Sequence, residues 1–478
     1  MRRFLAVLTC LMICACVFGA AGAENETGLL CNADASAETK ELMQWMQEVY
    51  GKKIISGQFL DEGRHGQELI AIGQETGGLF PAMVGLDLMN YSGSSIDLGA
   101  HPVTVDQAID YWKQGHIITM CWHWRPPEEY MDTTGTKWWG GFYTENTTFN
   151  LGKAMNGEDP GGYELMIEDL DRIAVQLQRL RDAGVPVLWR PLHEASGRWF
   201  WWGASGPEPY IQLYRLMYDR FTKVYGLNNL IWIWNGQNAA WYPGDDVVDI
   251  IGEDVYPGKH VHDSRKSEFD RCGTYGNGSK MIILSECGCV PSPEACQEDQ
   301  AMWGSWCVWC YEFVLDDQGN YSSEYTTEEK LKEAYNSPLV LTLRDVPAFG
   351  RKTETGSAEA ENSAVYHFSD GEVTGNVTKA GKTVQVRGNE KTDTVTIQIE
   401  VPEDGQYILR IVQAGIGGHK ENDILLDGEW IGNSIVQGEA EEACDLEPVF
   451  MTKGKHELTL QAVWGWVTLK TAELIRVP

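Results

Sequence analysis

The sequence alternates between short apolar runs and longer mixed segments over its first two thirds. Eight runs are nearly continuous in apolar residues: 52–59, 81–89, 116–124, 186–194, 230–235, 247–256, 280–288 and 305–313. Runs that are apolar on both faces, instead of alternating, are typical of parallel strands covered by helices on both sides of the sheet. The pattern therefore predicts eight buried parallel strands.

Segments between these runs have helical periodicity. Apolar residues recur every three or four positions from Tyr163 to Gly184 and from Ile211 to Gly226, and each segment ends at its glycine. Eight strands that alternate with helices predict a (β/α)8 TIM barrel, an α/β fold. A doubly wound open sheet is the alternative, but no glycine-rich fingerprint for a dinucleotide opens any of the helices.

The residue composition and the hydrophobic pattern of the chain change near position 350. Positions 351–357 are rich in polar and small residues and predict a linker. From 358 to 478, short runs alternate apolar and polar residues, turn sequences such as Asp427-Gly428 separate them, and no helical period occurs. This pattern predicts an all-β sandwich domain. A sandwich appended to an exported barrel is commonly a targeting module, and a purely structural cap is the alternative.

The first 23 residues predict export. Arg2 and Arg3 precede an apolar run, and small residues ending in Ala23 follow it, which is the order of a secretory signal peptide. The run is too short for a membrane span, and no later stretch is long and apolar enough to be one. We therefore expect residues 1–23 to be removed and a secreted chain to begin with a barrel domain over residues 24–350.

Charge and aromatic content narrow the range of partners. Asp and Glu number 69 against 38 Lys and Arg, which gives a net charge of -31. A surface this negative repels phosphate backbones and anionic lipids, so nucleic acid and membranes are not expected as partners. Of the 19 tryptophans, 15 lie between Trp112 and Trp309. Tryptophan offers a flat apolar face on which neutral sugar rings can stack.

Nine cysteines remain once the signal peptide is removed, and six of them lie between Cys272 and Cys310. Export permits disulfides, so we expect one or two structural disulfides together with buried thiols, in a pairing that the sequence does not fix. Cys307 and Cys310 have the spacing of a zinc or redox pair. They lie in a predicted strand, however, which makes this the weaker alternative.

Two glutamates at the ends of predicted strands carry the candidate chemistry. Glu194 ends the fourth run, and Glu286 lies near the end of the seventh. Strands four and seven face each other across the mouth of a barrel, where active sites form. Two carboxylates in an aromatic-lined cleft are what glycoside hydrolysis requires. The structural alternative pairs both glutamates with arginines in the core, and either glutamate turned from solvent and locked to an arginine would contradict the hydrolase interpretation as a whole.

Neighbouring residues fit the same chemistry. Trp199 and the aromatic residues after it would surround the acid with apolar groups, which raises the pKa of a carboxyl group. Asp254 and Tyr256, near the end of the sixth run, are expected to hold the nucleophile, because a phenol can donate a hydrogen bond to a carboxylate. Among the remaining tryptophans, Trp309 is expected near the sugar, whereas Trp201 and Trp202 are expected to pack in the barrel.

These motifs resemble glycoside hydrolase family 26. The resemblance rests on RPLHEASGRWFWWG (190–203), IGEDVYPG (251–258) and ILSECG (283–288), with WWGGFYTENTTF (138–149) in support. It covers about residues 38–350. Most members of that family are endo-β-1,4-mannanases with a (β/α)8 barrel and retaining chemistry, and the hydrolysis needs no cofactor.

The resemblance also implies roles for individual residues. Glu194 corresponds to the catalytic acid/base and Glu286 to the nucleophile. Four further residues correspond to substrate-binding positions: His193, Tyr256, Trp199 and His123. For His193, orientation of Glu194 is the alternative to direct contact with the substrate. In the family, the tyrosine of this set hydrogen-bonds the nucleophile. Ser196 is a departure, since some members have asparagine there.

From 357 to 478 the chain resembles carbohydrate-binding module family 35, through AEAENSAVYHF (358–368), VPEDGQYILRI and VWGWVTL. The resemblance implies a β-sandwich that binds sugar and often a structural calcium ion. Glu359 and Glu361 match the acidic pair that ligates calcium, a cation that prefers oxygen ligands. Trp464 and Trp466 match a site-forming segment, although the aspartate that usually follows it is missing here.

With the resemblance, the sequence predicts a secreted, monomeric, retaining endo-β-1,4-mannanase that acts on plant mannan, glucomannan or galactomannan. Within the same family, mixed-linkage β-glucan and β-1,3-xylan are alternative substrates. From another class, the alternative is a non-catalytic polysaccharide-binding protein. Its mark would be the loss of one of the two carboxylates, and both are present.

Overall fold

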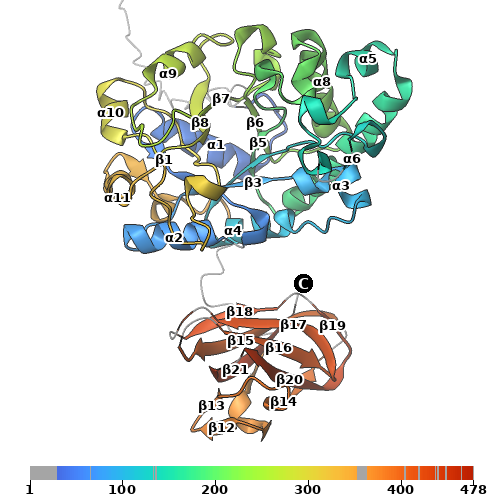
Figure 1. The fold of residues 1–478 in the computed structure, drawn as a ribbon, viewed down its shortest axis with the longest axis vertical. Coiled ribbons are helices and arrows are strands. Elements are labelled where there is room, and N and C mark those ends of the chain that lie inside the picture. Colours follow the sequence, from blue (N-terminus) through green and yellow to red (C-terminus); the bar gives the residue numbers. More distant parts are fainter. Residues whose placement is uncertain are drawn as a thin grey trace, which may run out of the picture. The chain divides into compact units, whose positions relative to one another are not determined.

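The chain divides into two units, Met1–Thr353 and Glu354–Pro478 (Figure 1). The computed structural model describes residues 30–351, apart from 65, 133, 135 and 136, and residues 363–476, apart from 403–404, 418–419, 437, 439–440, 447–448 and 465. The expected signal peptide and all but the first residue of the expected linker lie outside the described residues.

Seven parallel strands form the main sheet of the first unit, and their order in the sheet is their order in the chain. Each lies inside a run that the sequence predicts as a strand. They are β2 (Gly57–Phe59), β3 (Met83–Asp87), β4 (Ile117–Cys121), β5 (Val187–Arg190), β6 (Leu230–Trp234), β7 (Ile250–Val255) and β8 (Met281–Cys287). Their residues are almost all buried, as expected for strands with helices outside and side chains inside.

The eighth predicted strand closes this sheet through single bridges. Val308 is bridged in parallel both to Gln58 in β2 and to Cys287 in β8. Its N–H donates to the carbonyl of Gly57, and the carbonyl of Cys307 accepts from Cys287. The two edges of the sheet are thereby joined, and the predicted (β/α)8 barrel is confirmed. A short parallel pair, β1 (Ile54–Ile55) with β9 (Val340–Leu341), lies beside this junction.

Helices surround the barrel (Figure 1). The two with the clearest periodicity are confirmed: α6 starts at the N-cap Asp159 and ends before Gly184, and α8 continues into a π-helical turn before Gly226. The described helices are α1 (Ala37–Val49), α2 (Gln67–Thr76), α3 (Gly93–Asp97), α4 (Thr104–Gln114), α5 (Leu151–Asn156), α6 (Pro160–Asp182), α7 (Trp201–Ala204), α8 (Pro207–Asp219), α9 (Lys266–Cys272), α10 (Pro293–Glu298) and α11 (Glu328–Asn336).

Tryptophan makes up much of the core of the first unit. The largest fully buried side chains include nine tryptophans, among them Trp201 and Trp202, so the expectation that these two pack in the barrel is confirmed. Trp122 and Trp124 stack on each other with ring centres 4.2 Å apart. Most of the tryptophans in the first unit therefore serve packing, which leaves few of them for contact with a ligand.

The second unit is an all-β sandwich, as predicted. One sheet has the strand order β12-β13-β21-β15-β18, with β10 and β19 paired to it, and the other has the order β11-β14-β20-β16-β17. Buried and exposed residues alternate along β14 and β16, so one face of the second sheet packs inward. The strands are β10 (Ser363–His367), β11 (Glu372–Thr374), β12 (Val377–Ala380), β13 (Thr383–Val386), β14 (Thr394–Val401), β15 (Gly405–Gly415), β16 (Lys420–Leu426), β17 (Glu429–Val436), β18 (Glu442–Asp445), β19 (Val449–Met451), β20 (Gly454–Trp464) and β21 (Val467–Arg476).

The nine cysteines of the described residues are all free thiols, so the expectation of one or two disulfides is wrong. Several of the thiols are occupied by other groups. Cys272 donates to the carboxylate of Glu253, and Cys289 donates to the carbonyl of Gly258. Cysteines close together in the sequence thus face different surroundings. Across the part of the chain that the structure describes, no helix combines the length and the apolar character that a membrane crossing needs.

Candidate active site

Three carboxylates meet at the carboxyl ends of the barrel strands. Glu194 follows β5, Asp254 lies in β7 and Glu286 lies in β8. One carboxylate oxygen from each residue lies within 4.8 Å of an oxygen of the other two. Glu286 is 4% exposed and Glu194 is half-buried. The structure therefore brings Glu194 and Glu286 together across the barrel mouth, where the sequence predicted them.

The backbone turns sharply to place Glu194. Leu192 and Glu194 have φ angles of 52° and 53°, in the left-handed region that is costly for residues other than glycine. The N–H of Glu194 is held by Asn235, whose backbone carbonyl accepts it at 2.7 Å and whose side-chain oxygen lies at 3.2 Å. The indole of Trp202 donates to the carbonyl of His193. The turn is thus fixed on both sides of the residue that it presents.

Arg190, at the end of β5, lies beneath the carboxylates and is fully buried. It donates to Asp254 at 2.7 Å, and another of its nitrogens lies 3.1 Å from Glu286. The second oxygen of Asp254 accepts from Asn235 and Ser285, each at 2.7 Å. Both oxygens of Asp254 therefore accept hydrogen bonds, whereas Glu286 is held by its ion pair with Arg190 and by its contact with Asp254.

The ion pair between Arg190 and Glu286 is the kind of contact that we expected of a structural glutamate and not of a catalytic one. Glu286 is turned from solvent and paired with Arg190, which is the arrangement expected to contradict the hydrolase interpretation. This expectation was too strict, because Arg190 joins the carboxylate cluster without drawing Glu286 away from Glu194. One guanidinium does not balance the charge of three carboxylates. The cluster of carboxylates therefore binds a proton more readily than an isolated carboxylate does.

Glu194 has the environment of a proton donor. Burial, and then the negative charge of Asp254, raise its pKa to about 7. The charge of Arg190 and the indole of Trp199, which donates to Glu194 at 3.0 Å, act in the opposite direction. Burial raises the pKa of Glu286 well above its ordinary value, against the charge of Arg190, which lowers it. Because the groups interact strongly, they titrate as one set.

Tyr256 and Trp309 lie at the site, as the sequence predicted. Burial, followed by the charge of Glu286, raises the pKa of the Tyr256 hydroxyl well above its ordinary value. Among the described residues, no hydrogen bond joins this hydroxyl to Glu286, although the family resemblance implies one. Trp309 packs against Phe59, with ring centres 4.8 Å apart, and against His123 at 5.7 Å.

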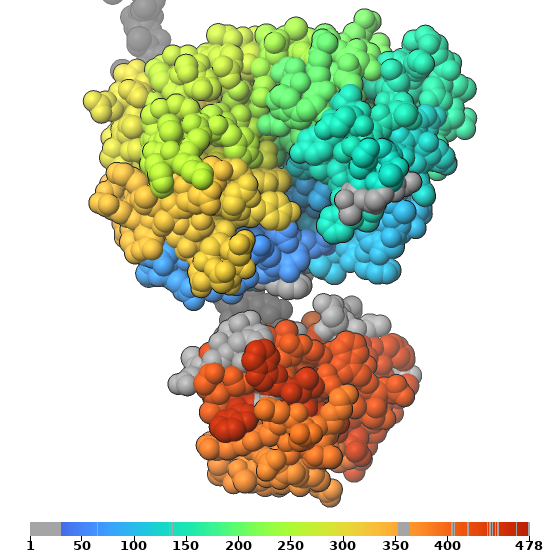
Figure 2. Space-filling view, viewed as in Figure 1, coloured from blue at the N-terminus to red at the C-terminus, as the bar shows by residue number. Residues whose placement is uncertain are grey.

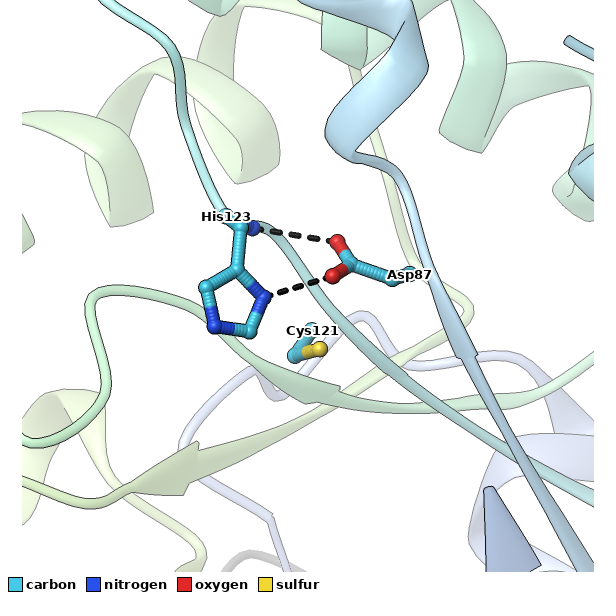
Figure 3. Close-up of side chains that lie close together, drawn as sticks. All are labelled: Asp87, Cys121 and His123. Atoms are coloured by element: carbon cyan, nitrogen blue, oxygen red, sulfur yellow. Dashed lines mark hydrogen bonds and ion pairs between the residues drawn. The ribbon is translucent and has the colours of Figure 1, made fainter. Parts of the chain in front are cut away.

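Two histidines lie beside Glu194. The Nε2 atoms of His123 and His193 are 3.1 Å apart. The Nδ1 atom of His123 lies 2.6 Å from the carboxylate of Asp87, which ends β3 (Figure 3). Cys121 is close to this pair, but burial raises the pKa of its thiol well above the ordinary value, so it is protonated.

The sequence reasoning missed Asp87 and Tyr143. Asp87 is the single charged residue of the second apolar run, a signal that the search of strand ends could have used. Tyr143, in the loops after β4, is 38% exposed, and its pKa is raised by burial and then by the charge of Glu194. In Figure 2 the first unit is hollowed where these teal loops face the gold segment beyond position 300.

Candidate residues of the second unit are only partly described. Trp464 and Trp466 are 61% and 43% exposed, and Trp430, which the sequence reasoning did not consider, is 62% exposed. Glu359 and Glu361, the candidate calcium ligands, lie outside the described residues.

Comparison with family models gives two matches. The model "Glycosyl hydrolase family 26" matches residues 31–345, and "Carbohydrate binding module (family 35)" matches residues 357–476. The two matches follow one another along the chain, and the first covers more than half of it.

Individual relatives match the first unit. A mannan endo-1,4-beta-mannosidase of Thermothelomyces thermophilus is 42% identical over 320 residues, which are 66% of this chain and 63% of that protein. Mannan endo-1,4-beta-mannosidase A of a Piromyces species is 34% identical over 67% of this chain and 51% of its own length. The chain thus matches less than two thirds of these relatives. The crystal structure of the Podospora anserina GH26-CBM35 beta-(1,4)-mannanase is 41% identical, with a TM-score of 0.62, over 67% of this chain and 69% of that one.

Proposed function

The chain belongs to glycosyl hydrolase family 26, and from this membership we propose that it is a secreted, retaining endo-β-1,4-mannanase. The substrates are plant mannan, glucomannan or galactomannan. One observation carries the proposal: oxygens of Glu194 and Glu286 lie within 4.8 Å of each other at the mouth of a barrel. Retaining glycosidases place their two carboxyl groups about 5–5.5 Å apart, and inverting enzymes place them farther apart to admit a water molecule.

In the first step, Glu194 acts as acid and Glu286 as nucleophile. Glu194 gives its proton to the glycosidic oxygen while a carboxylate oxygen of Glu286 forms a bond to the anomeric carbon. The bond between that carbon and the glycosidic oxygen breaks, and the leaving sugar departs as a neutral alcohol. In the second step, Glu194 takes a proton from water, the water oxygen attacks the anomeric carbon and Glu286 is released. Two inversions give net retention, and no cofactor takes part.

The surroundings of the two glutamates support this division of roles. The guanidinium of Arg190 is 3.1 Å from Glu286, and Glu194 has no arginine at that distance among the described residues. A nearby positive charge favours the ionised form of a carboxyl group, so Arg190 opposes the effect of burial on Glu286 and favours Glu194 as the carrier of the proton. With a pKa of about 7, Glu194 holds a proton in neutral solution and can still release it.

We further propose that the second unit binds the same polysaccharide. Trp464 and Trp466 offer exposed rings on which sugars can stack. The proposal includes a calcium ion held by Glu359 and Glu361, whose carboxylate oxygens suit this cation. Export would follow from the signal sequence over residues 1–23.

Two variants test the roles of the glutamates. In Glu194→Ala the hydrolysis of mannan falls about 10²–10⁴-fold, the usual contribution of a general acid. With an aryl mannoside that has a good leaving group, the loss of activity is smaller, because the leaving group no longer needs the proton of Glu194 to depart. In Glu286→Ala the hydrolysis of both substrates falls by at least the same factor. Glu168→Ala, an exposed position on α6, is the control. Near-normal hydrolysis by Glu286→Ala would disprove the assignment.

The polymer is tested separately. The protein is incubated with mannan, lichenan and β-1,3-xylan in parallel, and released oligosaccharides are measured. We expect products from mannan first. Preferred release from either of the other polymers would place the chain among the alternative specificities of its family, and binding without any release would indicate a non-catalytic protein.

A further inference from the structure

A line of hydrogen bonds connects the ends of three neighbouring strands: Asp87 at the end of β3, His123 after β4 and His193 after β5. Figure 3 shows its first contact, between Asp87 and His123. We propose that Asp87 is a positioning residue that fixes which nitrogens of the two histidines carry protons. The significance of this for catalysis rests on the proposed function, since His193 directly precedes Glu194. The arrangement of protons itself can be tested without substrate.

Both oxygens of Asp87 are occupied by donors. Oδ1 accepts from the backbone N–H groups of His123 and Met89 at 3.0 and 2.9 Å, and Oδ2 faces Nδ1 of His123 at 2.6 Å. The two backbone N–H groups that donate to Oδ1 favour the ionised form of this carboxyl group, because hydrogen bonds to a carboxylate lower its pKa. An ionised carboxylate only accepts hydrogen bonds. Nδ1 of His123 therefore carries a proton.

The same contacts argue against a metal ion between Asp87, Cys121 and His123, whose potential ligand atoms lie within 4.8 Å of one another. The carboxylate of Asp87 and Nδ1 of His123 share a hydrogen bond, and a metal ion would have to displace the proton of this hydrogen bond. Cys121 would have to lose its own proton at a buried position, which burial opposes. The cluster is a hydrogen-bonded unit.

The second contact fixes the protons of His193. Burial, and then the charge of Arg190, hold the pKa of His193 well below its ordinary value, so this imidazole is neutral. Its Nδ1 is buried without a partner among the described residues, and only Nε2 makes a hydrogen bond, to Nε2 of His123. A buried N–H without an acceptor is rarer than a buried acceptor without a donor. The proton of His193 therefore belongs on Nε2, and Nε2 of His123 is the acceptor.

This arrangement leaves both histidines neutral. The rings of Phe200 and Trp202 pack on His193 at 5.2 and 5.7 Å, which holds the imidazole next to Glu194. A glycosidase transition state resembles an oxocarbenium ion, and a cationic histidine beside it would oppose the developing positive charge. By fixing the tautomer, Asp87 keeps the imidazoles of His123 and His193 at the site as hydrogen-bonding groups and adds no positive charge there.

The isosteric change Asp87→Asn should reverse the proton positions. Two backbone N–H groups point at Oδ1 and one imidazole nitrogen points at Oδ2. The asparagine oxygen satisfies more donors by staying with the backbone, which turns its NH₂ group toward Nδ1 of His123. That nitrogen must then become the acceptor, and its proton moves to Nε2, opposite the Nε2 proton of His193. The contact between the histidines becomes donor against donor.

The experiment measures the tautomers directly. The full chain is labelled with ¹⁵N-histidine, and its side-chain ¹⁵N shifts are recorded for the wild type and Asp87→Asn, with assignments from single histidine variants. In the wild type, we expect His123 protonated at Nδ1 and His193 at Nε2; in Asp87→Asn, we expect His123 protonated at Nε2. The kcat/KM on mannohexaose should fall about 10–100-fold, by analogy with the loss when the hydrogen-bond partner of a metal-binding histidine is removed.

Asp159→Asn is the matched control. Asp159 caps α6 and accepts from Tyr130, asparagine caps a helix equally well, and neither group contacts the histidines. It should leave the shifts and kcat/KM unchanged. A doubly protonated His123 in the wild type, or Asp87→Asn with unchanged shifts and unchanged kcat/KM, would overturn the inference. If Asp87→Asn does not fold, the wild-type spectrum alone decides. The predicted tautomers in a protein that cleaves no mannan would contradict the proposed function and leave the tautomer inference standing.

Discussion

The proton of Glu194 is controlled at the scale of single residues. Its pKa of about 7 results from burial and the charge of Asp254, against which the indole of Trp199 and the charge of Arg190 act. The acid form is needed for the first step, so hydrolysis should decline as the pH rises through about 7. The indole contact is the easiest of these influences to remove without changing the charge of the site.

Trp199→Phe should move this decline to higher pH. The indole N–H stabilises the ionised form of Glu194, so its loss raises the pKa and keeps the acid protonated to a higher pH. Because Trp199 is 43% exposed, we expect a shift of roughly half a pH unit, less than a fully buried hydrogen bond to a charge would give. The alkaline limb of kcat is measured with mannohexaose. A limb that stays in place or moves to lower pH would contradict the account.

Single residues also show what can be predicted from sequence alone. Glu194 and Glu286 could be found, because a charged residue that ends an apolar strand is conspicuous and the barrel geometry says where it points. The roles of Arg190 and Asp87 could not, because each depends on side chains from strands far apart in the sequence. The sequence shows Arg190 only as part of a motif. It does not show the ion pairs of Arg190 with Asp254 in β7 and Glu286 in β8.

At the scale of elements, the turn that carries Glu194 is supported by α7. A Cβ atom on Gly203 would lie 2.1 Å from the backbone carbonyl oxygen of Ala195, a contact that no side-chain adjustment can relieve. The close approach of α7 to this turn therefore depends on the absence of a side chain at Gly203, and the placement of Glu194 depends on that approach.

Gly203→Ala should lower both stability and activity. The clash should cost about 1–3 kcal/mol, the range for overpacking, and displace the turn after His193, so kcat should fall as well. Gly161→Ala in α6 is the control, because its Cβ would meet nothing within 4 Å. Thermal unfolding and kcat are measured for both variants. A Gly203→Ala protein as stable and active as Gly161→Ala would show that α7 does not position the turn.

The strand predictions depended on the length of the apolar runs. Seven runs became strands of the sheet, but the eighth, from 305 to 313, pairs only through isolated bridges and continues into a 3₁₀ turn at Tyr311–Phe313. An apolar run shows that a segment is buried, and it does not show how regularly its backbone pairs. The free cysteines illustrate the same limit, since closeness in sequence did not bring their sulfur atoms together.

At the scale of the whole molecule, the chain joins a barrel to a β-sandwich, and each unit was recognisable from its own periodicity. The contribution of the second unit should depend on the physical form of the substrate. A soluble oligosaccharide reaches the active site by diffusion, whereas an insoluble polymer must be held near it, so a linked binding unit raises the effective concentration only in the second case.

The double variant Trp464→Ala/Trp466→Ala tests this. Stacking of a base on an aromatic side chain is worth about 1–3 kcal/mol, and if each sugar contact is worth a similar amount, the loss of two rings should weaken binding to insoluble mannan at least tenfold. Hydrolysis of insoluble mannan should fall with it, and hydrolysis of mannohexaose should be far less affected. Phe450→Ala is the control, because Phe450 is 59% exposed and pairs with Gln406 near the start of β15, whereas Val467, next to Trp466, pairs with Gly415 at the end of that strand. Equal binding by the double variant and the control would show that the two tryptophans are not the sugar site.

The central claim is that Glu286 and Glu194 hydrolyse the β-1,4 linkage by two successive inversions. Proton NMR during the first minutes of mannohexaose cleavage, before the anomers equilibrate, tests it most directly. The account predicts that the new reducing ends appear first as the β-anomer and then mutarotate toward the α-anomer. New reducing ends that appear first as the α-anomer would mean a single inversion by water, and the proposed nucleophilic role of Glu286 would be wrong.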